Sequence, residues 1–231
     1  MASIAHLPPP GQKDRAMLSR LATTLVPLFG ALTISSETGA EPAPGSIIAA
    51  NHTSLADPAI VLAALHRLGA RPVVLATAGL WRIPGLGRAL TREGHIPVHR
   101  GTEHAAQALD GATAALADGR CVLIYGEGGL PRRRDSGEAA PGTFRSGLAR
   151  LAIATGAPVV PLGQAGARRL SSGSATKQLA GVLTAPLRRP GYHVHLGAPV
   201  RAVGGIPESG AVLREAVTGA WQEAADRLLR Q

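Results

Sequence analysis

The sequence predicts a single α/β domain, in which helices flank a central mixed and mostly parallel sheet. Short apolar runs alternate along the chain with longer Ala/Leu-rich segments, which is the pattern of strands and helices in this fold class. The length of 231 residues suits one domain with a substantial core. A content of 45% hydrophobic and 17% charged residues argues against a disordered chain.

The N-terminal part, residues 1–35, is expected to form a tail and an apolar helix ahead of the main domain at 36–231. The proline-rich start lacks the basic segment and apolar core of a signal peptide. Residues 16–34 are largely apolar, but Arg20 and Pro27 make them a poor membrane-spanning helix. They suit either a helix lying in a membrane interface or a helix packed on the domain.

Six apolar runs of five or six residues are predicted strands, and four longer Ala/Leu-rich segments are predicted helices. The strands are expected at 46–50, 72–76, 94–98, 120–125, 158–162 and 192–196. The helices are expected near 58–68, 102–117, 143–156 and 209–230. Two connections are predicted loops by their composition, the Gly/Ser-rich stretch 171–174 and the basic stretch 131–141.

The charge balance narrows the classes of partner. The chain has 24 Lys and Arg against 15 Asp and Glu, a net charge of +9, and almost all the positive residues are arginine. Arginine suits the phosphates of nucleic acid, anionic lipid or coenzyme A, although a base-composition bias of the genome explains surface arginines equally well. Only 3% of residues are aromatic and no zinc-finger pattern is present, which disfavours nucleic acid. The one cysteine, Cys121, excludes a disulfide framework and fits a reducing compartment.

A histidine and an aspartate follow the first of the six predicted strands. His52 and Asp57 are five positions apart, about 140° around a helix, so they can meet only if a turn lies between them. Thr53 and Ser54 supply such a turn. A histidine can take a proton near neutral pH, and a carboxylate on its other ring nitrogen fixes the tautomer. The pair is therefore a candidate general base. A second interpretation, compatible with the first, is that Asp57 caps a helix that has Pro58 in its first turn.

Two further strand ends carry candidate binding groups. Arg100 follows the run 94–98 and can pair with a phosphate or carboxylate in the same crevice, or can simply be a surface arginine. Tyr125, Gly126 and Glu127 end another run and lead into Gly128-Gly129. Backbone N–H groups of the two glycines can bind an anion or a developing oxyanion, although a plain glycine-rich turn has the same pattern.

The order of these blocks resembles the glycerolipid acyltransferase family, which includes the 1-acylglycerol-3-phosphate acyltransferases. The blocks are Asn-His-x4-Asp, Gly-x5-Arg, Glu-Gly after an apolar strand, and Val-Val-Pro-Leu-Gly, and they span about 45 to 165. The resemblance implies direct transfer of an acyl group from a thioester of coenzyme A or acyl carrier protein to a hydroxyl. Lysophosphatidic acid is the default acceptor, and no cofactor, metal or covalent acyl-enzyme is implied. His52 is then the general base and Asp57 orients it.

The resemblance also implies a substrate-binding set, in which the third block departs from the family pattern. Arg100, Glu127, Gly128 and Gly129 match substrate-binding positions, but the family's usual block reads Phe-Pro-Glu-Gly-Thr-Arg. Here Gly129 replaces the threonine and Leu130 replaces the arginine, two residues that hold the acceptor's phosphate in the family. Arg132 and Arg133 are candidate substitutes. A non-phosphorylated hydroxyl or an amine acceptor in specialised metabolism is therefore an alternative.

Two more hypotheses change the class of function. One is a non-catalytic relative that binds lipid or anions. The second is a metal hydrolase that uses His52, Asp57, His95 and His99. In the favoured interpretation the partners are the acyl thioester and a lipid or hydroxylated acceptor. The expected location is the cytoplasm, with peripheral contact at the inner face of the cell membrane if residues 16–34 bind lipid.

Overall fold

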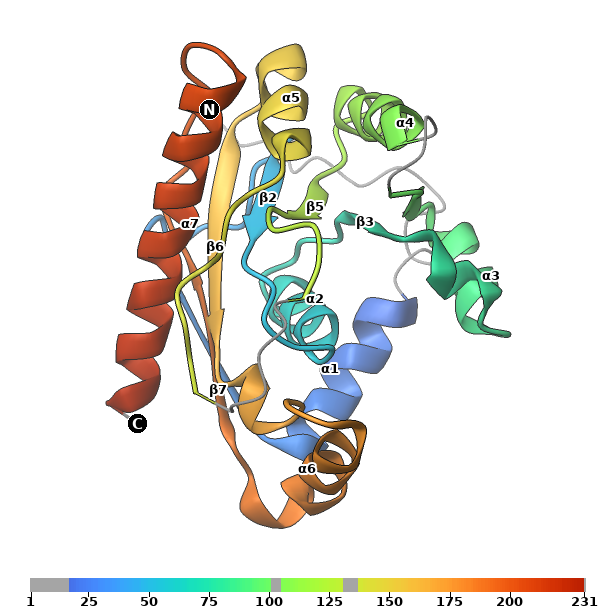
Figure 1. Cartoon of the computed structure of the whole chain (residues 1–231), viewed down its shortest axis with the longest axis vertical. Coiled ribbons are helices and arrows are strands. Elements are labelled where there is room, and N and C mark those ends of the chain that lie inside the picture. The colour runs from blue at the N-terminus through green and yellow to red at the C-terminus, as the bar shows by residue number, and fades with distance from the viewer. Residues whose placement is uncertain (1–16, 101–104, 131–136, 231) are drawn as a thin grey trace, which may run out of the picture.

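The predicted fold class is confirmed by the computed structural model, which describes residues 17–100, 105–130 and 137–230 (Figure 1). Seven strands form one sheet in the spatial order β1-β7-β6-β2-β5-β3-β4. All neighbouring pairs are parallel except β6 and β7. The strands are β1 (Ala31–Ser36), β2 (Ile47–Ala50), β3 (Val73–Thr77), β4 (Ile96–Val98), β5 (Val122–Tyr125), β6 (Val159–Ala165) and β7 (Gly191–Leu196).

Helices cover both faces of the sheet. On one face α1 (Met17–Phe29) packs on α2 (Asp57–Arg67) and also contacts α6 (Ala175–Arg188). On the other face lie α4 (Ala105–Ala117), α5 (Ser146–Thr155) and α7 (Ile206–Leu229), and α7 is at the opposite side of the molecule from α1 and α6 in Figure 1. The remaining elements are the short helices α3 (Leu86–Glu93), η2 (Ala78–Arg82) and η3 (Ala167–Arg169).

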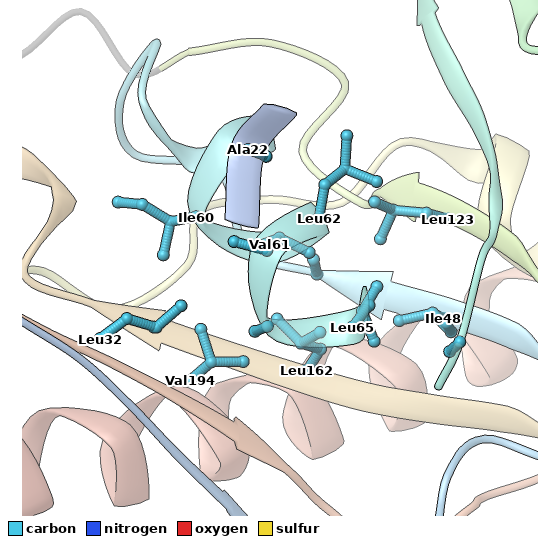
Figure 2. Packing of buried hydrophobic residues seen from close by; sticks show 14 of the residues in the cluster. Ala22, Leu32, Ile48, Ile60, Val61, Leu62, Leu65, Leu123, Leu162 and Val194 are labelled. Carbon is cyan, nitrogen blue, oxygen red and sulfur yellow. The ribbon is translucent and has the colours of Figure 1, made fainter. Parts of the chain in front are cut away.

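The burial of strand β2 explains why its apolar sequence lies at the centre of the sheet. Its four residues are fully buried, and they alternate between the two cores of the domain. Ile48 and Ala50 belong to the core under α1 and α2, whereas Ile47 and Ala49 belong to the core under α4, α5 and α7. A central parallel strand buried on both faces reads as a continuous apolar run, as it does here. Figure 2 shows the first core, where α2 contributes Ile60, Val61, Leu62 and Leu65.

Apart from the short helices η2 and η3, three elements were not predicted, and the N-terminal helix is shorter than predicted. The apolar segment 16–34 is a helix only to Phe29 and then becomes strand β1, which pairs with β7 across the boundary expected at residue 35. The helix ends at Gly30, where a Cβ atom would lie 2.3 Å from the Pro190 carbonyl oxygen. Helix α3 and helix α6 complete the three, and α6 follows directly after the loop predicted at 171–174.

Helix length and polarity bear on any membrane role. Within the described ranges, no helix is both long enough and apolar enough to cross a membrane.

Candidate active site

The candidate site lies at the carboxyl ends of the central strands. Strand β2 is flanked by β5 and β6, so successive strands add to one side of β2 and then to the other. Such a reversal opens a crevice at the carboxyl ends of the strands, where α/β proteins bind ligands. His52 follows β2, Glu127 follows β5, and Arg100 follows β4. The topology therefore gathers at one edge the three side chains that the sequence placed at separate strand ends.

His52 and Asp57 form a hydrogen-bonded pair. The Nδ1 atom of His52 lies 2.9 Å from the Oδ2 atom of Asp57, and the residues between them form the predicted turn. The Asp57 side chain is fully buried, whereas 14% of the His52 side chain is exposed. Because a carboxylate only accepts hydrogen bonds, Nδ1 carries the proton and Nε2 is left as the basic nitrogen. This is the geometry that a general base requires.

Asp57 is held by backbone donors from the turn that precedes it. The N–H groups of Thr53 and Ser54 both donate to Oδ2, the latter at 2.9 Å. Helix α2 begins at Asp57 itself, with Ala56 in the N-cap position and no side-chain cap. The interpretation of Asp57 as the cap of this helix is therefore wrong. Its carboxylate closes the His52–Asp57 turn, which fixes both members of the pair.

Gln164 is a site residue that the sequence analysis missed. Its fully buried amide donates to Asp57 Oδ1 at 2.8 Å and to Thr53 Oγ1 at 2.9 Å. The side-chain amide of Asn51 in turn donates to the Gln164 carbonyl at 3.0 Å and accepts from its N–H at 2.8 Å, which ties the end of β2 to β6. The predicted strand ended at 162, so Gln164 was outside it. A polar residue two positions after the predicted apolar strand was the signal available.

Glu127 is hydrogen-bonded to the backbone of the His52–Asp57 turn. Oε2 accepts from the His52 N–H at 2.6 Å, and Oε1 accepts from the Gly142 N–H at 2.7 Å. Burial raises the pKa of this carboxyl, and the two backbone donors act in the opposite direction. Both carboxylate oxygens of Glu127 therefore accept hydrogen bonds from backbone amides, and one of these amides belongs to His52.

The glycine turn after β5 has a defined shape. Gly128 adopts a left-handed conformation with φ of 65°, and its N–H donates to the Tyr125 carbonyl at 3.0 Å. That bond removes the Gly128 N–H from the candidate oxyanion donors and leaves the Gly129 N–H of the pair. At Gly126 a Cβ atom would lie 2.4 Å from the ring of Phe144, so this ring fills the space that a side chain would need.

Two arginines lie against this turn. An added Cβ at Gly129 would be 3.4 Å from Nη1 of Arg100, and one at Gly128 would be 2.9 Å from Cγ of Arg145. Arg100 was predicted, whereas Arg145, at the N-cap position of α5, was not singled out. The predicted substitutes Arg132 and Arg133 lie outside the described residues.

A large apolar cavity opens beside the pair. Its volume is about 1350 Å³, and His52, Arg100 and Arg145 line it together with Gly128. Most of the lining residues are apolar, and they come from α1, α2, α3, α4 and α5 as well as from β3 and β5. Known small-molecule pockets measure roughly 300–1,000 Å³, so this space suits a long apolar ligand. His52 and the two arginines thus line one largely apolar cavity.

The histidines proposed for a metal site have other surroundings than a metal centre would give them. His95 accepts a hydrogen bond from the Val74 N–H at Nδ1, 3.0 Å away, so Nε2 carries the proton and faces Glu93 Oε2 at 3.4 Å. Burial lowers the pKa of His95 to about 4. His99 is exposed at the end of β4. Over the described ranges, no group of three or more His, Cys, Asp or Glu side chains is arranged to hold a metal ion.

Comparison with known proteins places this arrangement in a family. The acyltransferase family model matches residues 32–164, more than half of the chain and all of β2 to β5. Among solved structures, the fold is similar to the 1-acyl-sn-glycerophosphate (LPA) acyltransferase PlsC from Thermotoga maritima, with a TM-score of 0.68 and 20% identity over 92% of this chain and 78% of that one. A search of curated proteins found no match. The chain belongs to the acyltransferase family.

Proposed function

We propose that the protein transfers a fatty acyl group from an acyl thioester of coenzyme A or acyl carrier protein to an acceptor hydroxyl. Lysophosphatidic acid is the default acceptor. The observation that carries the proposal is the hydrogen-bonded His52–Asp57 pair, in which Asp57 is buried and His52 lines a cavity large and apolar enough for an acyl chain.

The proton moves through His52. The Nε2 atom of His52 takes the proton of the acceptor hydroxyl, and the hydroxyl oxygen attacks the carbonyl carbon of the thioester. The tetrahedral intermediate collapses with cleavage of the carbon–sulfur bond, and the imidazolium gives the proton to the leaving thiolate. Asp57 stabilises the imidazolium from the Nδ1 side at 2.9 Å. The products are an ester and a free thiol, so every atom and proton is accounted for without a covalent acyl-enzyme.

The developing oxyanion needs donors that are already in place. The Gly129 N–H is the remaining candidate of the glycine turn, because the Gly128 N–H is bonded to the Tyr125 carbonyl. Preorganised donors of this kind raise the rate by a factor of about 10²–10³.

Arg100 and Arg145 support an acceptor that carries a phosphate. Both line the cavity, and both lie against the glycine turn within the same site. A guanidinium binds phosphate through two parallel hydrogen bonds. Arg145 thus supplies a second cation although Leu130 occupies the family's arginine position. This geometry favours a phosphorylated acceptor over a non-phosphorylated one.

The test is a thiol-release assay on the purified full chain. Acyl thioesters of different chain length are offered with lysophosphatidic acid, glycerol 3-phosphate and a monoacylglycerol. We expect release that depends on the acceptor and is fastest with a long acyl chain and lysophosphatidic acid. Release that is independent of any acceptor, or absent with every pair, would contradict the proposal.

A variant of Arg145 tests whether this residue binds the phosphate of the acceptor. Arg145→Met should raise KM for lysophosphatidic acid roughly ten- to a hundredfold, the equivalent of losing one charged hydrogen bond of about 1.5–3 kcal/mol. KM for the monoacylglycerol should stay unchanged. Arg214→Met, an exposed arginine on α7, is the matched control. An equal rise for both acceptors would remove Arg145 from phosphate binding.

A further inference from the structure

The side chain of Tyr125, the last residue of β5, lies against the imidazole ring of His52. The centroids of the two rings are 4.4 Å apart, and the ring planes are tilted by 31°. Two rings that lie side by side in one plane need a larger separation of their centroids, so the imidazole lies over the face of the phenol ring. The parallel pairing of β5 with β2, in which Tyr125 is level with Ala50, brings the two side chains together.

Asp57 and Tyr125 contact His52 from different directions. The Asp57 carboxylate lies 2.9 Å from Nδ1, at the edge of the imidazole, whereas Tyr125 covers one face of the ring. One contact at the edge and one at the face together fix the plane of the imidazole. Any positive charge that forms on His52 therefore lies between a carboxylate and the negative face of an aromatic ring.

The other charged groups near His52 act on this positive charge in opposite directions. Glu127 accepts a hydrogen bond from the His52 N–H at 2.6 Å, and a negative carboxylate there favours an imidazolium. Arg100 and Arg145 line the same cavity as His52, and their guanidinium groups disfavour a further positive charge. An aromatic face against the imidazole adds stabilisation on the side of the carboxylates.

The contact with His52 is made by the ring of Tyr125, and the hydroxyl is a separate feature. The hydroxyl oxygen is buried and has no hydrogen-bond partner among the residues that the structure describes. Burial raises the pKa of the phenol well above its ordinary value, and the Asp57 carboxylate acts in the same direction, so the ring stays neutral. A buried hydroxyl without a partner costs stability. What Tyr125 offers His52 is therefore the electron-rich face of its ring.

We propose that Tyr125 is a positioning residue that stabilises the imidazolium form of His52 in the transition state through the face of its ring. When Nε2 takes the proton of the acceptor hydroxyl, the imidazole gains a positive charge. A cation within about 6 Å of the centroid of an aromatic ring is attracted to the ring face. The proposal rests on the acyl transfer proposed above and adds no covalent step, since the proton still passes to the leaving thiolate.

The first test compares kcat for acceptor-dependent thiol release in variants of the full chain. Tyr125→Leu removes the ring and keeps apolar bulk, so kcat should fall about two- to thirtyfold. Tyr125→Phe keeps the ring, so kcat should stay within about twofold of wild type, and thermal melting should show a protein at least as stable. A fall in Tyr125→Phe as large as that in Tyr125→Leu would assign the effect to the hydroxyl and overturn the proposal.

A series of fluorinated rings separates the effect on charge from packing, because Tyr125 also lines the cavity. The side chain of Tyr125→Phe is given one, two and then three ring fluorines, which withdraw electron density from the ring face and change its shape little. The logarithm of kcat should fall stepwise towards the value of Tyr125→Leu. The same series at Phe144 is the matched control, because that ring packs at Gly126 and should leave kcat within about twofold. A flat series at position 125, or an equal fall in both series, would overturn the proposal.

An NMR titration of His52 in the same proteins needs no turnover. A ring face that stabilises the imidazolium raises the pH at which His52 loses its proton, so this pH should fall by about 0.3–1.5 units along the fluorine series. If the wild type releases no thiol but the titration moves in this way, acyl transfer is contradicted and the role of the ring stands. If thiol release is observed but neither kcat nor the titration responds to fluorine, acyl transfer stands and the role of the ring is contradicted.

Discussion

Replacing Gln164 by leucine should weaken catalysis without touching His52. The Gln164 amide is fully buried and donates to Asp57 Oδ1 at 2.8 Å. Without it, the side-chain donor left to that oxygen is the Thr53 hydroxyl at 3.5 Å. Leucine keeps the apolar bulk but removes both amide donors, so the Asp57 carboxylate loses the contact that fixes its rotation relative to His52.

The magnitude follows from the bond that is lost. A hydrogen bond to a charged group is worth about 1.5–3 kcal/mol. If the full free energy of this hydrogen bond is lost from the stabilisation of the transition state, kcat falls roughly ten- to a hundredfold. Each 1.36 kcal/mol of barrier height changes the rate by about tenfold. KM should change little, because Gln164 is not among the residues that line the cavity.

The assay is steady-state thiol release combined with urea denaturation. Gln222→Leu is the matched control, because this exposed glutamine on α7 also donates to an aspartate, Asp226, at 2.9 Å. The control should leave kcat unchanged and cost less than about 0.5 kcal/mol in stability. Wild-type kcat in Gln164→Leu would refute the view that Asp57 must be held from both oxygens.

Two further predictions concern stability. In Gly163→Ala the new methyl would lie 2.1 Å from the backbone of Ala220, so the contact of β6 with α7 must shift and the free energy of unfolding should fall by at least about 1–3 kcal/mol. In Gly219→Ala, one residue from that contact, nothing lies within 4 Å and the helix should gain about 0.5–1 kcal/mol; the same sign in both variants by chemical denaturation would contradict the packing argument. Burial lowers the pKa of His193 from 6.5 to about 4, so the unfolded chain takes up this proton first and stability is lost as the pH falls through that range. Relative to His193→Gln, the wild type should lose about 3 kcal/mol between about pH 7 and pH 4, and a pH-independent difference would count against a neutral buried His193.

The fold could be predicted wherever burial on both faces left a continuous apolar run. Strand β2 and strand β5 were placed within one or two residues for this reason. Strand β1 was not, because Ala31–Ser36 is half polar and follows an apolar helix with only the single Gly30 between them. Helix α6 was missed because its large apolar residues face outward, so its pattern does not identify a core-facing side.

The site was predictable to the extent that it depends on strand ends. His52, Asp57 and Arg100 follow strands whose carboxyl ends meet at one edge of the sheet. In the structure His52 is hydrogen-bonded to Asp57, and His52 and Arg100 line the same cavity. The polar character of Gln164 just after an apolar run was a weak local signal, but its contacts depend on which strand lies next to β2, which is a tertiary fact. The same holds for Arg145, which reaches the glycine turn from the start of α5.

The central claim is that His52 removes the proton of the acceptor. The most direct measurement is kcat for acceptor-dependent thiol release in His52→Ala, with His99→Ala as the exposed-histidine control and melting curves for both. The account predicts that kcat falls by about 10²–10⁴ in His52→Ala while the protein remains folded, and that the control retains activity. Wild-type kcat in a folded His52→Ala protein would contradict the account.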